Sequence, residues 1–152
     1  MKQKVVVFSQ IDATVLDQLE RDYHVVVLNP KQGDINEQIR TEVVDADAMI
    51  GAGRLLNETN LAPAQKLKII STVSVGYDNY DVDYLTKNNI WLANTPHVLT
   101  ETTADLAFTL LVSAARKVPE LDQWTKNGEW KRTVGPAQFG QDIFGKTLGI
   151  IG

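Results

Sequence analysis

The sequence contains no cysteine and only two histidines, His24 and His97, among its 152 residues. Without thiols there is no disulfide framework, no cysteine nucleophile and no thiolate metal site, and two histidines are too few for a histidine-rich metal centre. No apolar run approaches the ~18 residues of a membrane span, and the run from Val5 to Phe8 is too short for a signal peptide. We therefore expect a soluble, cytoplasmic protein with no metal site and no membrane partner.

Positive charge is also scarce, because 15 Lys and Arg residues face 19 Asp and Glu residues, for a net charge of -4. Nucleic acids and anionic membranes bind proteins through concentrated basic surface, so this balance argues against a nucleic-acid partner. The remaining composition, 43% hydrophobic and 22% charged, is that of an ordinary globular protein.

Apolar segments rich in β-branched residues alternate with amphipathic segments over the first ~95 residues. The predicted strands are Lys4–Ser9, His24–Leu28, Ala48–Ile50, Lys68–Val73 and Ile90–Ala93, and the predicted helices are Thr14–Asp22, Ile35–Asp45, a short one near Leu61–Gln65, and Val82–Lys87. Such alternation predicts an α/β fold with a parallel sheet and helices on both faces. Five strands indicate a flavodoxin-like doubly wound domain with strand order 2-1-3-4-5.

The pattern changes after Thr95-Pro96. A long helix is predicted at Thr102–Val118, apolar on nearly every face, with Thr102 and Asp105 as a capping box and Pro119 as its stop. A helix that is apolar all round needs more than one partner, which predicts a domain junction or a subunit interface. A second helix is predicted at Glu120–Lys126.

The last residues, Thr147–Ile151, form a β-branched run typical of a buried strand, and no partner strand follows it. We interpret the chain as the N-terminal part of a longer protein. It would comprise a first domain at residues 1–99 and the start of a second domain at residues 100–152.

Two glycine-containing loops follow predicted strands. Gly51-Ala52-Gly53 fails the dinucleotide fingerprint because Leu56 stands where the third glycine is needed, so we expect a tight turn there. Arg54 remains a candidate for a substrate-facing loop, since ligands bind at the carboxyl ends of parallel strands.

The second loop, Ser74–Asp81, is a candidate anion site. Gly76 would permit a turn that directs consecutive backbone N–H groups at a ligand. A purely structural interpretation is compatible with this one: Gly76 makes the turn and Asp81 caps the next helix. Arg54 is the one arginine expected to converge on this loop as a carboxylate partner. For His24 we favour a packing role, and His97 follows the junction without a nearby carboxylate that would make it a general base.

Four segments together resemble the D-isomer-specific 2-hydroxyacid dehydrogenases, in particular the glyoxylate/hydroxypyruvate and 2-ketogluconate reductases. They are Ser71–Asp81, Asn94–Pro96, Leu99–Asp105 and Lys146–Gly152. The resemblance implies an NAD- or NADP-dependent oxidoreductase that reduces a small 2-keto acid. It also implies that residues 1–99 are the substrate-binding domain and that residues 100–152 begin an incomplete, NAD(P)-binding Rossmann domain.

The same resemblance assigns roles to several residues. The backbone N–H groups of Val75 and Gly76 would bind the substrate carboxylate, Thr103 would contact the cofactor, and Gly152 would open the pyrophosphate loop. The helix at 102–118 would form a homodimer interface.

The family's catalytic Arg, His and Glu lie beyond residue 152, so no catalytic residue is assigned within this chain and the chain alone is expected to be inactive. Two alternatives remain: a self-standing flavodoxin-like binding module, and a non-enzymatic, dehydrogenase-like corepressor. The unpartnered strand and the long apolar helix argue against the first alternative, and residues beyond 152 would discriminate the second.

Overall fold

The computed structural model describes residues 2–151, and the chain divides into two compact units, Met1–Val98 and Leu99–Gly152. Each unit is described by itself. No helix in the described part of the chain combines the length and apolar character needed to cross a membrane.

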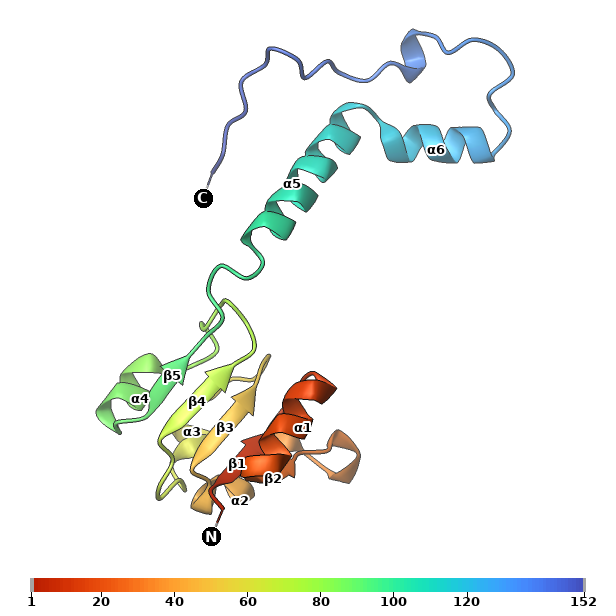
Figure 1. The fold of residues 1–152 in the computed structure, drawn as a ribbon. Coiled ribbons are helices and arrows are strands. Elements are labelled where there is room, and N and C mark those ends of the chain that lie inside the picture. Colours follow the sequence, from red (N-terminus) through yellow and green to blue (C-terminus); the bar gives the residue numbers. More distant parts are fainter. Residues whose placement is uncertain (1, 152) are drawn as a thin grey trace. The chain divides into compact units, whose positions relative to one another are not determined.

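The first unit is built on one sheet of five parallel strands (Figure 1). The strands are β1 (Lys4–Val7), β2 (His24–Val27), β3 (Ala48–Gly51), β4 (Ile69–Thr72) and β5 (Trp91–Ala93). Their order is β2-β1-β3-β4-β5, which confirms the predicted doubly wound topology. The direction of winding reverses between β1 and β3, so the loops after these strands diverge and leave room for a ligand.

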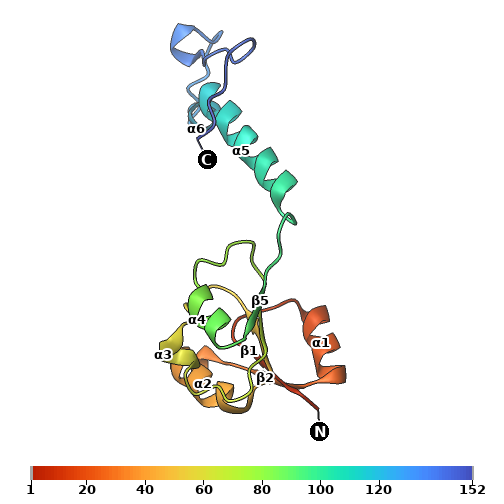
Figure 2. The same cartoon turned by 90° about the vertical axis from the view of Figure 1, so that its left-hand side faces the viewer.

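Helices connect the strands on both faces of the sheet. They are α1 (Ala13–Asp22), α2 (Ile35–Glu42), α3 (Glu58–Leu61) and α4 (Val82–Lys87), with short 3-10 helices at Pro30–Gln32 and Val43–Asp45. Figure 2 shows α1 on one face and the other three on the opposite face. Side chains of Asp12, Asp34, Asn57 and Asp81 accept hydrogen bonds from backbone N–H groups at the helix starts. Such caps satisfy donors that a helix leaves unpaired.

The short third helix lies earlier than predicted. It begins after Asn57, whose side chain and that of Asn60 form a reciprocal capping box, and it ends before Pro63. The prediction placed Pro63 in its first turn. The stronger signal was the asparagine pair, because capping side chains fix where a short helix starts.

The core lies between the sheet and the α2–α4 face. Val6, Met49 and Ile70 occupy neighbouring strands in register, and each is at most 1% exposed. The face that carries α1 is covered unevenly: along one row of the ladder Val5 is 4% exposed, Ile69 39% and Trp91 75%. Helix α1 therefore shields β1, and the β4–β5 side of that face is open in the described unit.

The second unit contains α5 (Thr100–Ala115), α6 (Val118–Lys126) and a 3-10 helix at Pro136–Gln138. The predicted capping box is wrong, because α5 begins at Thr100 after Leu99 and no side chain caps it. The predicted stop at Pro119 is wrong as well. The break is at Lys117, whose φ is 55°, and Pro119 sits in the first turn of α6, where a missing N–H costs nothing.

The predicted strand at Thr147–Ile151 does not form, since these residues have no regular secondary structure. A strand is stabilised by hydrogen bonds to a neighbour, and no described segment pairs with this one. Ile150 and Ile151 are consequently 85% and 102% exposed. Apolar character predicted the strand, but its formation needs a partner.

Candidate active site

The segments that follow the five parallel strands begin at the carboxyl edge of the sheet in the first unit, the edge at which doubly wound domains bind ligands. The loops after β3 and β4 are fastened together through Leu56. Its N–H donates to the Asn79 carbonyl at 2.8 Å, and its carbonyl accepts from Asp81 N–H at 3.0 Å. The two predicted site loops are thus neighbours.

The turn after β3 needs both of its glycines. A Cβ on Gly51 would lie 2.7 Å from Cδ2 of the buried Phe8 ring, and Gly53 has a left-handed φ of 71°. Ala52 N–H donates to Ser9 Oγ at 2.8 Å, which ties the turn to the end of β1. These contacts explain the glycines without a nucleotide, in agreement with the failed fingerprint.

Arg54 follows this turn and is partly buried. It lines a hollow of about 560 Å³ together with Ser9, Gln10 and the end of β2, and it makes no ion pair with a carboxylate among residues 2–151. Val75 and Gly76 do not line this hollow. That Arg54 contacts the substrate therefore stays a prediction.

In the loop after β4, three consecutive backbone carbonyls are held by the protein. Ser74 O accepts from Thr95 N–H at 3.1 Å, Val75 O from the Asn94 side-chain amide at 2.9 Å, and Gly76 O from the Ser74 hydroxyl at 2.7 Å. The N–H groups of Val75 and Gly76 donate to no other described residue, and both residues are exposed. Unpaired consecutive N–H groups are the donors of an anion nest.

The φ of Gly76 does not lie in the left-handed region. A Cβ there would meet Asp78 Oδ2 at 3.5 Å, an ordinary contact. Neither φ nor space requires a glycine. What a glycine provides at this position is an unobstructed approach to its own N–H and that of its neighbour.

A buried hydroxyl pair lies beneath the loop. Thr72 is fully buried at the end of β4, and its hydroxyl oxygen lies 2.6 Å from that of Ser74. Burial raises the pKa of the neighbouring Tyr80 phenol. Tyr80 therefore stays neutral at physiological pH, and its hydroxyl donates to the Gly51 carbonyl at 3.5 Å.

The sequence prediction missed the contributions of Thr72 and Asn94 to this loop. Thr72 is the last residue of β4 and Asn94 is the first residue after β5, so both lie at the same sheet edge as Gly76. A polar residue where a parallel strand ends next to a glycine loop is the signal that would have found them.

The other candidates lie elsewhere. Thr103 is exposed in the first turn of α5, where its N–H donates to the Leu99 carbonyl. Gly152 lies outside the described residues. His24 is exposed, so a packing role for it is wrong, and the exposed His97 has a φ of 67°. Across residues 2–151, no three acidic or histidine side chains gather to hold a metal ion.

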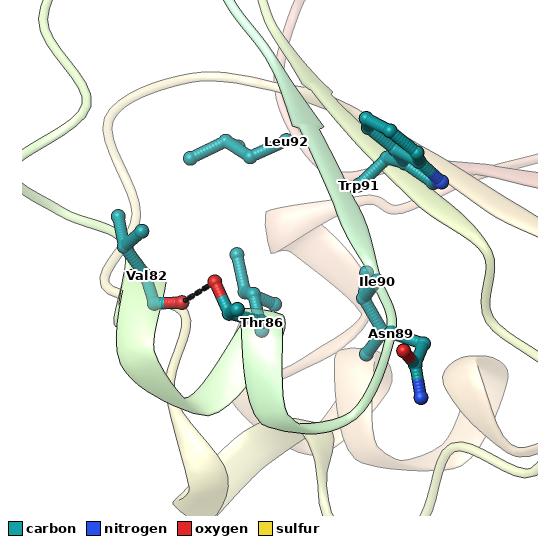
Figure 3. A pocket seen from close by; sticks show the side chains of 7 residues that line it. Val82, Thr86, Asn89, Ile90, Trp91 and Leu92 are labelled. Atoms are coloured by element: carbon teal, nitrogen blue, oxygen red, sulfur yellow. Dashed lines mark hydrogen bonds between the residues drawn. The ribbon is translucent and has the colours of Figure 1, made fainter.

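A separate hollow of about 380 Å³ lies between α4 and β5 (Figure 3). Its lining is mainly apolar and carries no titratable side chain, and the Thr86 hydroxyl is committed to the Val82 carbonyl at 2.7 Å. It lies beside the strand rather than at its carboxyl end. It has no group that would bind or activate a charged substrate.

Comparison with known proteins decides the family. The sequence model of the D-isomer specific 2-hydroxyacid dehydrogenases, catalytic domain, matches residues 5–145. The chain belongs to this family. Glyoxylate/hydroxypyruvate reductase B of Serratia proteamaculans is 39% identical over 152 residues, all of this chain and 47% of that protein. The chain thus spans about half the length of the curated relatives it matches.

Solved structures agree with the fold. The NADPH-dependent glyoxylate/hydroxypyruvate reductase of Sinorhizobium meliloti, solved with NADP and malonate, superposes with a TM-score of 0.77 at 27% identity, over 100% of this chain and 46% of that one. D-Lactate dehydrogenase of Aquifex aeolicus, solved with NAD and lactic acid, superposes with a TM-score of 0.73 at 17% identity, over 92% of this chain and 41% of that one. At that identity the second likeness supports the fold alone.

The described residues do not themselves form a dinucleotide site. A pyrophosphate needs a glycine-rich turn at a helix start; the turn at Gly51–Gly53 is filled by its own contacts, and the loop before α4 contains the single glycine Gly76. Thr103 offers a single hydroxyl. These residues thus lack the turn that would hold a pyrophosphate.

Proposed function

We propose that this chain is the substrate-binding part of an NAD(P)-dependent reductase that converts a small 2-keto acid to its 2-hydroxy acid. The observation that carries the proposal is the loop after β4, where the carbonyls of Ser74, Val75 and Gly76 are occupied and the N–H groups of Val75 and Gly76 are not. Two adjacent N–H donors match the two oxygens of a carboxylate.

A nearby cation would strengthen such a site. Asp78 lies beside Gly76, and its charge opposes an incoming anion. Arg54, on the neighbouring loop and without an acidic partner in the described chain, is the group we propose to offset that charge. Glyoxylate, hydroxypyruvate and 2-ketogluconate all present the required carboxylate next to a carbonyl group.

Reduction of the carbonyl requires a hydride and a proton, and a histidine oriented by a carboxylate would be a suitable proton donor. Among residues 2–151 neither histidine forms an ion pair with a carboxylate. We propose that these groups come from outside this chain and that Thr103 and Gly152 contact the cofactor. The 152-residue chain assayed with glyoxylate and NADPH or NADH should show no turnover above the uncatalysed rate.

Binding is tested with oxalate, a non-reducible dicarboxylate, titrated into the isotope-labelled chain. We expect the largest amide shifts at Val75 and Gly76, with sodium chloride at equal ionic strength as the control. Shifts confined to other residues, or the same shifts with chloride, would remove this loop from the site. An Arg54→Gln variant should weaken oxalate binding by about ten- to a hundredfold, since a hydrogen bond to a charged group is worth about 1.5–3 kcal/mol.

We further propose that the parent protein is a homodimer through the helix at residues 102–118. In the second unit α5 buries none of its side chains, and Leu106, Phe108 and Leu110 are each 58–60% exposed. An apolar helix surface of this kind is typical of an association site.

A further inference from the structure

We propose that Asn94 and Ser74 are positioning residues that aim individual N–H groups of the loop after β4 at the substrate carboxylate. This inference builds on the proposed function. It names the two side chains that hold the donors and adds the N–H of Tyr77 as a third donor.

The argument starts from the peptide unit. In a trans peptide the carbonyl of one residue and the N–H of the next point in opposite directions in one plane, and the described chain has no cis peptide bond. Whatever holds a carbonyl therefore fixes the direction of the following N–H. Each of the three occupied carbonyls in this loop directs one donor outward.

The correspondence is one to one. The backbone N–H of Thr95 holds Ser74 O and so directs the N–H of Val75. The side chain of Asn94 holds Val75 O at 2.9 Å and so directs the N–H of Gly76. A carbonyl oxygen only accepts hydrogen bonds, and the asparagine side chain donates only through its amide nitrogen. The Val75 carbonyl therefore determines which way the Asn94 amide is turned.

Ser74 completes the set. Its hydroxyl donates to Gly76 O at 2.7 Å and so directs the N–H of Tyr77, which also donates to no other described residue. A hydroxyl has one hydrogen, so in the 2.6 Å contact with Thr72 the donor must be Thr72. The buried Thr72 thereby fixes the rotamer of Ser74, and β4 itself becomes the support of the loop.

The two contacts differ in what they require. Thr95 acts through its backbone, so its side chain is free to vary. Asn94 and Ser74 act through side chains on different elements, one beyond β5 and one beyond β4. Substituting either should disturb one N–H and leave the others in place, a pattern that a general loss of stability would not produce.

The test measures N–H directions in the isotope-labelled 152-residue chain by residual dipolar couplings. Asn94→Ala should shift the coupling of Gly76 and lower its order parameter from about 0.85 toward 0.6, and Ser74→Ala should do the same at Tyr77. Asn88→Ala is the matched control, because the Asn88 amide also donates to a carbonyl, that of Tyr84 at 2.8 Å, but at the C-terminal end of α4. Strand couplings at Val6 and Ile70 report whether the sheet is intact.

Oxalate affinity is measured on the same samples. We expect Asn94→Ala and Ser74→Ala each to weaken binding roughly three- to tenfold, as for loss of one hydrogen bond, and Asn88→Ala to leave it unchanged. If Asn94→Ala disturbs the sheet, the nearly isosteric Asn94→Asp, which cannot donate to the carbonyl, replaces it. Its coupling at Gly76 and its oxalate affinity are then compared with those of Asn88→Asp.

Unchanged couplings at Gly76 in the Asn94 variants, or equal changes throughout the loop, would overturn the positioning roles. If the couplings change residue by residue but oxalate does not shift the loop amides of the unsubstituted chain, the positioning roles stand and the proposed function fails. The two hypotheses are thus tested separately.

Discussion

At the scale of single residues, two glycines at the same sheet edge have different reasons to be glycine. Gly51 is crowded, since a Cβ would lie 2.7 Å from a ring atom of the buried Phe8. Gly76 is not crowded, since a Cβ would meet only Asp78 Oδ2 at 3.5 Å. Packing therefore requires the first glycine, and we attribute the second to ligand access.

Alanine at each position separates these reasons. Gly51→Ala should lower the free energy of unfolding by about 1–3 kcal/mol through overpacking against Phe8. Gly76→Ala should change it by less than about 0.5 kcal/mol and yet weaken oxalate binding, because the new methyl group stands beside the N–H donors. Urea denaturation and the oxalate titration measure the two effects. Equal destabilisation by both substitutions would contradict the distinction.

A carboxylate at the opposite edge of the sheet links stability to pH. Asp47 accepts from Lys4 N–H at 2.9 Å and pairs with Lys66 at 3.4 Å, and these contacts, the backbone bond foremost, lower its pKa below the usual 3.8. Because the folded-state pKa is the lower one, the stabilisation is complete above the unfolded pKa and is lost as pH falls through the folded value.

Removing that carboxylate should flatten the acid limb of the stability curve. In Asp47→Asn the unfolding free energy should fall less steeply than in the unsubstituted chain as pH drops from about 5 to about 2. Urea denaturation at several pH values measures the slope. Parallel curves for the two proteins would show that Asp47 has no part in it.

At the scale of elements, most of the first unit could be predicted from the sequence. The strands were recognised because each is a short apolar run between turn residues, and α4 was placed at its observed bounds, Val82–Lys87, because Asp81 caps it. Where prediction failed, the deciding contact was non-local or absent. The run at 147–151 lacks a partner strand in the described chain, and Lys117 adopts a left-handed conformation that no local sequence pattern predicts.

The candidate site was less predictable than the fold for the same reason. Gly76 was found from its place after a strand, but the side chains that hold its loop come from β4 and from beyond β5. Residues about twenty positions apart meet only once the sheet has formed. A sequence pattern shows which loop is suited to bind an anion but not which side chains fix its carbonyls.

Helix caps offer a direct test of the element scale. Asp34 accepts from the N–H groups of both Asn36 and Glu37 at the start of α2, whose Ile35 and Ile39 are buried in the core. Asp34→Ala should therefore lower the unfolding free energy by about 1 kcal/mol, whereas Asp34→Asn, which retains an acceptor, should change it by a few tenths. Denaturation of both variants checks this. Equal losses would show that the charge rather than the acceptor matters.

At the scale of the whole molecule, the two units differ in how much apolar surface they bury. The first encloses a continuous core between its sheet and three helices, which is why about 100 residues suffice for a stable fold. The second has no buried side chain in α5 or α6, and its stacked Trp124 and Trp130 rings, 6.2 Å apart, are its one aromatic pair in the described residues. Its exposed helix surface is the part of the chain most prone to associate.

The last prediction concerns that association. In light scattering the chain should have twice the monomer mass, because α5 buries none of its side chains and exposes large apolar residues, among them Leu106, Phe108 and Leu110, around its surface. Phe108→Glu should give a monomer, since a dimer would bury an unpaired charge. Phe144→Glu, at a residue 92% exposed outside the helix, is the matched control and should leave the dimer intact. A monomeric unsubstituted chain, or a dimer that survives Phe108→Glu and dissociates with Phe144→Glu, would rule out α5 as the interface.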